Sequence, residues 1–416
     1  MNNTNTSPHL YVLTTFICAV IGLIMFYRYQ VNPQLYFVPV LLLAIFHAAI
    51  HFIRQCQQPD YYHIARNIKI FQLLRRAIVR YLVWLLIIYA AQQLYLNLPY
   101  YRESNFTAAH VFFEKILSWY WFAGLPYFCL TLIFKASRIE DYYDPAIRLI
   151  HIVKQVATRI LQRKNLRSIL FVFRKQYNRK VLLILLVRAY FIPTLIIQVY
   201  GNLSNAIAIT QRNYNDYDFV SLLFFVSAML WLMDTINASL AYAIESRWLE
   251  NRPRSIDMTV SGWLVCLSCY APLNSLTGTV FPWAPSVATD NPADLVIPSL
   301  DLFYAVKITE VLMLVAHIYT DVSLGSAVAN ITLRKLQTRG FYGIIRHPGT
   351  TLKLLYFLLS AIFYKAFWHV EFIFGYLAWA AIYIMRALTE ERHLKHHAVY
   401  RDYMAKVKYR FIPYIF

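Results

Sequence analysis

Long apolar runs, spaced along the whole chain, constrain what it can fold into more than any other feature. A helix needs about 20 apolar residues to cross about 30 Å of hydrocarbon, and FVSLLFFVSAMLWLM at 219–233 lies in one such run. Of the 416 residues, 59% are hydrophobic and only 15% are charged, whereas soluble domains carry roughly 25% charged residues. These features predict an all-α fold, a polytopic transmembrane helical bundle.

About ten spans are expected from the lengths of the apolar runs. They cover residues 10–27, 35–53, 79–96, 111–134, 181–200, 218–243, 259–275, 299–320, 351–367 and 370–388. The last two are expected to form a tight hairpin through the sequence KAFWHVE.

Lys and Arg predict the orientation of these spans, because cytoplasmic loops of membrane proteins carry an excess of both. Five segments are rich in them: 54–80 has six, 135–180 twelve, 246–256 three, 334–346 four and 386–416 seven. The loops between these segments carry almost none. With ten spans, all five basic segments fall on the same side of the membrane, so both termini are expected in the cytoplasm. The expected location is the inner membrane in a bacterium or the endoplasmic reticulum in a eukaryote.

The same reading divides the chain into four parts. Residues 1–134 form N-terminal transmembrane helices, 135–180 a basic amphipathic cytoplasmic segment, 181–324 further transmembrane helices with a possible substrate region, and 325–416 a C-terminal region with a candidate site. In 135–180, apolar residues recur at helical spacing with basic residues between them. This pattern predicts one or two helices lying along the inner leaflet and contacting anionic lipid headgroups, the alternative being a solvated connector. The net charge of +19 is therefore attributed to membrane contact and not to nucleic acid. The oligomeric state is not indicated.

Ionisable residues inside expected spans are candidate functional groups, because they are costly at membrane depth. In the span 299–320 and just beyond it, Lys307, Glu310, His317 and Asp321 fall on one helix face. Lys307 and Glu310 can form an ion pair. The candidate substrate-region residues are Lys307, Glu310 and His317, together with Asp234 of the span 218–243. The alternative is that they serve only as polar contacts between helices.

Two polar clusters flank the expected C-terminal hairpin, which would bring them to the same membrane surface. Arg386 and Glu390 are spaced i,i+4 and can pair. A mixture of carboxylates and cations suits a zwitterionic cofactor. The first cluster is Arg339, Arg346, His347, Pro348 and Lys353; the second is Arg386, Glu390, Glu391, Arg392 and His393.

The order of motifs over about 325–416 resembles a known family. RHP at 346–348 is followed, after the hairpin, by RALTEERHL at 386–394 and YRDYMAKVKYRFIP at 400–413. This order is similar to that of the integral membrane methyltransferases that include isoprenylcysteine carboxyl methyltransferase and the related phospholipid methyltransferases. The chain departs from the family pattern at Thr350 and Leu352, where the family usually has Tyr and Gly.

The resemblance implies an S-adenosylmethionine-dependent methyltransferase acting on a membrane lipid or lipidated substrate at the cytoplasmic face. Arg346, His347 and Glu390 would be catalytic. The implied cofactor-binding residues are these three together with Pro348, Lys353, Arg386, Glu391, Tyr400 and Tyr403. Tyr400, Tyr403, Arg410 and Pro413 would fold the tail over the cofactor. No metal is expected, although His393, His396 and His397 have a spacing that zinc sites also use.

The residues leave the methyl acceptor open. A carboxylate would need only a cation to orient it, for which Arg346 and Lys353 are candidates. An amine or thiol would need a base, for which Glu390 and His347 are candidates. Two other readings also stay open: a membrane reductase of the sterol-reductase type using NADPH, and a non-catalytic transporter or assembly protein.

Overall fold

The computed structural model describes residues 7–29, 32, 35, 37–56, 69–102, 106–133, 144–211, 218–246 and 249–415. Most of these residues lie in helices, in agreement with the all-α prediction. The one sheet within the described ranges pairs two short strands, β1 (Ser255–Ile256) and β2 (Thr332–Leu333), antiparallel.

The chain divides into two compact units. The first comprises residues 1–31, 36–47 and 198–416, and the second comprises 32–35 and 48–197. Helices α2 (Val38–Cys56) and α8 (Gln176–Thr210) contribute residues to both.

In the second unit, α3 (Ile70–Asn97) packs along α4 (Thr107–Ile133), followed by α6 (Pro145–Leu161) and α7 (Leu166–Arg174). The rings of Tyr81 and Tyr120 stack between α3 and α4, with centroids 5.3 Å apart. The Asp144 carboxylate caps α6 by accepting from the Ala146 amide, and its other oxygen accepts from Arg80 of α3 at 2.8 Å. This ion pair ties the start of α6 to α3.

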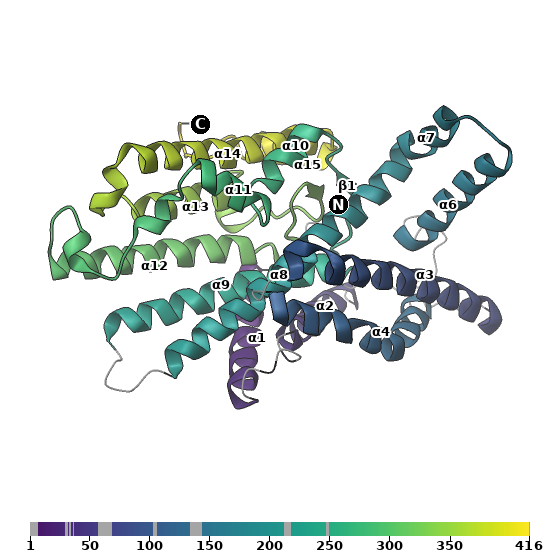
Figure 1. The fold of residues 1–416 in the computed structure, drawn as a ribbon, viewed down its shortest axis with the longest axis horizontal. Coiled ribbons are helices and arrows are strands. Elements are labelled where there is room, and N and C mark those ends of the chain that lie inside the picture. Colours follow the sequence, from purple (N-terminus) through teal and green to yellow (C-terminus); the bar gives the residue numbers. More distant parts are fainter. Residues whose placement is uncertain are drawn as a thin grey trace. The chain divides into compact units, whose positions relative to one another are not determined.

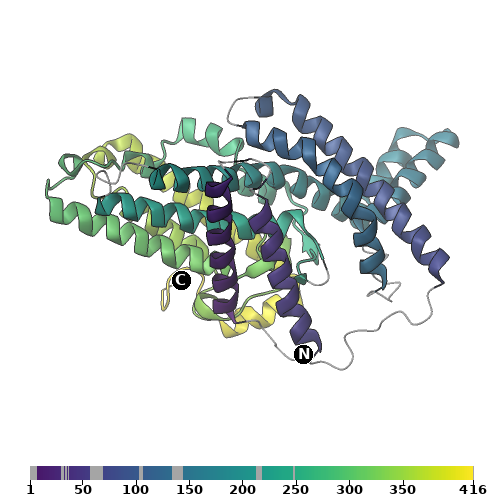
Figure 2. The same ribbon diagram turned by 90° about the horizontal axis from the view of Figure 1, so that it is seen from below.

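In the first unit, α9, α12, α13 and α14 lie alongside one another in that order (Figure 1). Helix α1 lies against α9 and α12 (Figure 2). The helices of this unit are α1 (Pro8–Arg28), α9 (Phe219–Ala243), α10 (Val260–Leu267), α11 (Leu273–Val280), α12 (Leu300–Val322), α13 (Pro348–Leu359), α14 (Val370–Leu394) and α15 (Ala398–Lys406).

Five helices of the described ranges are long and apolar enough to cross a membrane: α1, α8, α9, α12 and α14. They coincide with five of the ten expected spans. The expected spans 35–53, 79–96 and 111–134 coincide with α2, α3 and α4, which are not among the five. The count of ten and the cytoplasmic placement of both termini stay predictions.

The remaining two expected spans, 259–275 and 351–367, are wrong as single spanning helices. The first is broken into α10 and α11, each of eight residues. The second contains α13, whose 12 residues reach only about 18 Å at 1.5 Å per residue. Apolar composition predicted both as spans, but Pro272 and the polar residues around it interrupt the first, and a turn follows Leu359 in the second.

Hydrogen bonds tie the non-helical backbone near these segments to the rest of the unit. The indole of Trp379 in α14 donates to the Phe281 carbonyl at 3.1 Å, and the Lys365 ammonium donates to the Ala293 carbonyl at 2.9 Å. The Val296 amide donates to the Phe363 carbonyl. Irregular backbone is tolerated at membrane depth only where protein covers it. Segments of this kind can therefore cross without being continuous helices.

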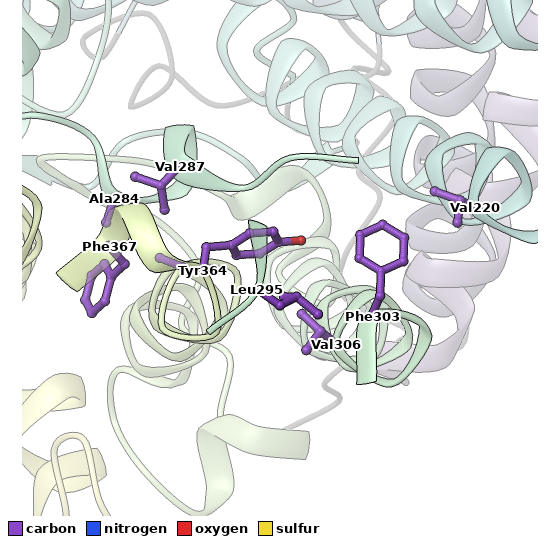
Figure 3. Packing of buried hydrophobic residues seen from close by; sticks show 9 residues of the cluster. Val220, Ala284, Val287, Leu295, Phe303, Val306, Tyr364 and Phe367 are labelled. Atoms are coloured by element: carbon purple, nitrogen blue, oxygen red, sulfur yellow. The ribbon is translucent and has the colours of Figure 1, made fainter. Parts of the chain in front are cut away.

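The turn of the C-terminal hairpin is anchored beside the N-terminal half of α12 (Figure 3). Tyr364 is fully buried there, against a cluster that includes Leu295, Phe303 and Val306. The short 3-10 helix Lys365–Trp368 then leads into α14, which confirms the hairpin. At the other end of segment 349–364, Gly349 lies against Asp321 near the C-terminal end of α12. The segment therefore runs antiparallel to α12.

Candidate functional site

The RHP segment lies where the chain enters α13. Pro348 occupies the first helical turn, where its missing amide proton is not needed, and His347 is the residue before the helix. Gly349 packs closely against the end of α12: a Cβ there would lie 2.6 Å from an Asp321 carboxylate oxygen, so the Asp321 side chain would have to move to admit one. The RHP segment therefore lies beside the end of α12.

The two polar clusters meet at the Glu391 carboxylate near the end of α14. Arg346 Nε donates to Glu391 Oε1 at 2.5 Å, and Arg410 Nε donates to Glu391 Oε2 at 2.9 Å. The backbone amides of Arg346 and His347 donate to the carbonyls of Tyr409 and Arg410, both at 2.9 Å. The hairpin and the folded tail therefore bring together the residues that flank the hairpin in sequence. We call this arrangement the Glu391 clamp.

The Arg346 guanidinium is committed to the clamp. Its Nη1 also donates to the carbonyls of Val407 and Lys408, at 2.8 and 2.6 Å. Both Arg346 and Glu391 side chains are only 5% exposed. A buried charge pair with this many hydrogen bonds fixes the tail, so a structural role for both residues follows directly from the geometry.

His347 is beside the clamp but less tightly bound. Its Nε2 lies 3.3 Å from Glu391 Oε1, within ion-pair distance, but within the described part of the chain this nitrogen makes no hydrogen bond of acceptable geometry. The imidazole packs against the Phe411 ring, with centroids 5.6 Å apart. Glu391 and Phe411 therefore hold the imidazole in place beside the clamp.

Tyr400 and Tyr403 are buried beneath the tail in a core with Leu333, Leu394 and Val407. The Tyr403 hydroxyl donates to the Tyr342 carbonyl at 2.7 Å. The Tyr400 hydroxyl is buried and makes no hydrogen bond within the described ranges. Burial raises the pKa of both phenols above the ordinary value, so both remain protonated and able to donate.

Arg386 and Glu390 do not form the expected i,i+4 ion pair. The Arg386 guanidinium instead turns to the side-chain oxygen of Asn330, which also accepts from the Tyr270 hydroxyl at 3.2 Å. It lies over the Tyr270 ring, 5.4 Å from its centroid. Asn330 and the Tyr270 ring are therefore the partners of Arg386 in place of the Glu390 carboxylate. Glu390 is half-buried and makes no hydrogen bond or ion pair among the described residues.

Lys353 lies one turn and a half into α13 with its ammonium over the Tyr383 ring, 5.8 Å from the centroid. It makes no ion pair with any residue that the structure describes. Its ammonium is therefore held by an aromatic face and not by a carboxylate of the described residues.

The polar residues of α12 lie in two pairs, of which the spacing had suggested Lys307–Glu310. Lys307 Nζ lies 3.6 Å from Glu310 Oε2, and His317 Nε2 lies 3.7 Å from Asp321 Oδ2. The Lys307 ammonium also lies 5.6 Å from the centroids of two rings, those of Phe303 and Tyr364. The first pair therefore lies beside the hairpin-turn core, whose Phe303 and Tyr364 are labelled in Figure 3, whereas the second lies near Gly349, toward the clamp.

The sequence reading missed three residues that position the site. Asn330 and Tyr270 hold Arg386, and Tyr342 accepts from Tyr403. Asn330 and Tyr270 lie in bends and Tyr342 in the short 3-10 helix Gly340–Gly343. None of the three belongs to a motif, so no signal in the sequence could have singled it out. Of the three histidines at the end of α14 and just beyond it, His393 bonds to the Ser255 hydroxyl at 3.0 Å, and its ring centroid lies 5.9 Å from that of His397. Among the described residues, no group of three or more His, Cys, Asp and Glu could hold a metal ion.

Comparison with protein families, curated proteins and solved structures found no match. The functional argument therefore depends on the geometry above and on the order of the C-terminal motifs.

Proposed function

We propose that the protein is an S-adenosylmethionine-dependent membrane methyltransferase that modifies a lipidic or lipidated acceptor at the cytoplasmic face. The observation that carries the proposal is the convergence of His347 and the Glu390–Glu391 pair at one end of the hairpin. Arg346 and Glu391 are 45 positions apart and in direct contact. This is the juxtaposition that the resemblance of the motif order implies.

Polar groups around the clamp are of the kinds that the cofactor needs. Glu390 offers a carboxylate for ribose hydroxyls or an ammonium group, and Tyr400 a buried hydroxyl donor. His347 offers an imidazole beside the Glu391 carboxylate. Arg386 adds a guanidinium able to take the carboxylate of an amino acid. These four residues would hold the cofactor, whereas Arg346, Glu391 and Tyr403 would position the segments that carry them.

The cofactor would supply an electrophilic methyl group whose departure leaves a neutral thioether, so no acid is needed. The protein would then accelerate the transfer by holding the acceptor in line and excluding water. Lys353 is the better candidate to orient an anionic acceptor, because Arg346 is already bound to Glu391 and to two carbonyls. For an amine or thiol acceptor, Glu390 or His347 would take the proton. The acceptor would enter from the bilayer between helices, near the pair His317–Asp321.

Ligand-dependent thermal unfolding of the purified protein tests the proposal. S-adenosylmethionine and S-adenosylhomocysteine should both raise the midpoint, since a ligand that binds only the folded state stabilises it. Stabilisation by NADPH alone would support the reductase, and no response to any of the three would support a transporter or assembly protein.

Glu390→Gln is the sharpest variant for this measurement. Losing a charge-assisted hydrogen bond of about 1.5–3 kcal/mol should weaken S-adenosylhomocysteine binding about 10- to 100-fold. The fold should be unaffected, since Glu390 has no hydrogen bond or ion pair among the described residues. Unchanged affinity in both Glu390→Gln and His347→Ala would show that the cofactor does not bind here.

A further inference from the structure

The hairpin formed by α6 and α7 in the second unit presents an apolar face that no described residue covers. Leu166, Leu170 and Phe173 follow one side of α7 at i, i+4 and i+7, and all three are exposed. Val172, about a third of a turn around the helix, is fully buried. The side of α7 that carries Leu166, Leu170 and Phe173 is therefore turned away from the protein.

Basic side chains flank this face and have no acidic partner in the hairpin. Arg167 and Arg174 lie beside the apolar face on α7, and Arg163 and Lys164 form the turn between the helices. Residues 145–180 contain ten Lys and Arg and no Asp or Glu. The whole hairpin is thus a positively charged element with exposed leucines and phenylalanines.

The hairpin is also built to hold its shape. The helices lie side by side (Figure 1), and the Arg159 guanidinium of α6 donates to the Ser168 carbonyl of α7. Asn178 is fully buried; its amide donates to the Val172 carbonyl at 2.7 Å and its oxygen accepts from Arg148 at 2.8 Å. Asn165 caps α7. A fixed hairpin keeps the exposed apolar face and its flanking cations together.

We propose that the α6–α7 hairpin docks on an anionic lipid leaflet, with the side of α7 that carries Leu166, Leu170 and Phe173 inserted among the acyl chains. An amphipathic helix with a basic polar flank lies in the interface with its apolar face buried about 5–10 Å deep. Charge complementarity selects the occupant: phosphate-bearing headgroups match the arginines, and only a bilayer also accommodates the apolar side chains. This inference is independent of the methyltransferase proposal.

Amide hydrogen exchange over 166–174 tests the inference, with the full-length protein in nanodiscs. Exchange should be slower in discs containing phosphatidylglycerol than in pure phosphatidylcholine, and added salt should reverse the difference. In Arg167→Gln/Arg174→Gln, the equilibrium constant for docking should fall about 25-fold, since each basic side chain near an anionic surface contributes about fivefold. Equal exchange in the two lipids would overturn the proposal.

A matched pair of acidic variants separates insertion from simple charge attraction. Leu166→Glu/Leu170→Glu should abolish the protection, whereas Ala157→Glu/Thr158→Glu adds the same charge at exposed positions of α6 and should retain part of it. Equal loss in both would show that nothing inserts. If tRNA slowed exchange in phosphatidylcholine discs as much as phosphatidylglycerol does, the surface would be a nucleic-acid site instead. Size-exclusion chromatography checks that each variant stays folded.

Discussion

The two adjacent glutamates at the end of α14 should respond very differently to the same substitution. Glu391→Gln keeps the shape of the side chain but removes the charge that two arginines share. Breaking a buried ion pair costs about 3–5 kcal/mol, and the Arg346–Glu391 pair, at 5% exposure of each side chain, belongs to that class. Arg410 is 33% exposed, so its pair adds at most about 1 kcal/mol.

Because Gln can still accept one hydrogen bond, the lower end of the range applies, a loss of about 3–4 kcal/mol. For a unit of roughly 250 residues this corresponds to a fall of roughly 10 °C in the unfolding midpoint. Glu390→Gln is the control, with an expected change within about 0.5 kcal/mol, typical of a site without partners.

Two measurements on each variant check this reasoning. Thermal unfolding in detergent, followed by tryptophan fluorescence, gives the midpoint. Hydrogen exchange at the amides of Arg346 and His347 reports tail docking directly, because they donate to the carbonyls of Tyr409 and Arg410. Faster exchange is expected in Glu391→Gln alone. Equal midpoints for the two variants, or unchanged exchange at 346–347, would refute the assignment of Glu391 to the clamp.

Two further matched pairs test the packing of the first unit. Gly375→Ala should destabilise the protein by about 1–3 kcal/mol, because the new methyl would lie 2.2 Å from the Pro282 carbonyl oxygen. Gly201→Ala has open space around its position and should stabilise α8 by roughly 0.5–1 kcal/mol. Equal thermal midpoints for the two variants would contradict the close approach of Gly375 to Pro282. Tyr403→Phe should cost about 1–3 kcal/mol, because it leaves the part-buried Tyr342 carbonyl without its hydrogen bond. Tyr400→Phe removes a hydroxyl that has no partner among the described residues, so stability should be unchanged. The same variant should weaken S-adenosylhomocysteine binding in a calorimetric titration.

The sequence by itself determined the helical class, five long apolar helices and the hairpin that returns the chain to the clamp. Each of these depends on local properties: the length of an apolar run, a helical period, or a Pro at the start of a helix. The ion pair Lys307–Glu310 was predictable for the same reason, since residues three apart on a helix are neighbours.

Only the tertiary structure decided which partners the charged residues take. Arg386 had a carboxylate one turn away but turns to Asn330 and Tyr270, and Glu391 rather than Glu390 receives the two arginines. Each choice depends on groups far apart in the chain, because a buried polar group takes the partner that packing brings to it, not the one nearest in sequence. The segments 259–275 and 351–367 are as apolar as spans, yet the structure divides the first between two eight-residue helices and ends α13 at Leu359 in the second.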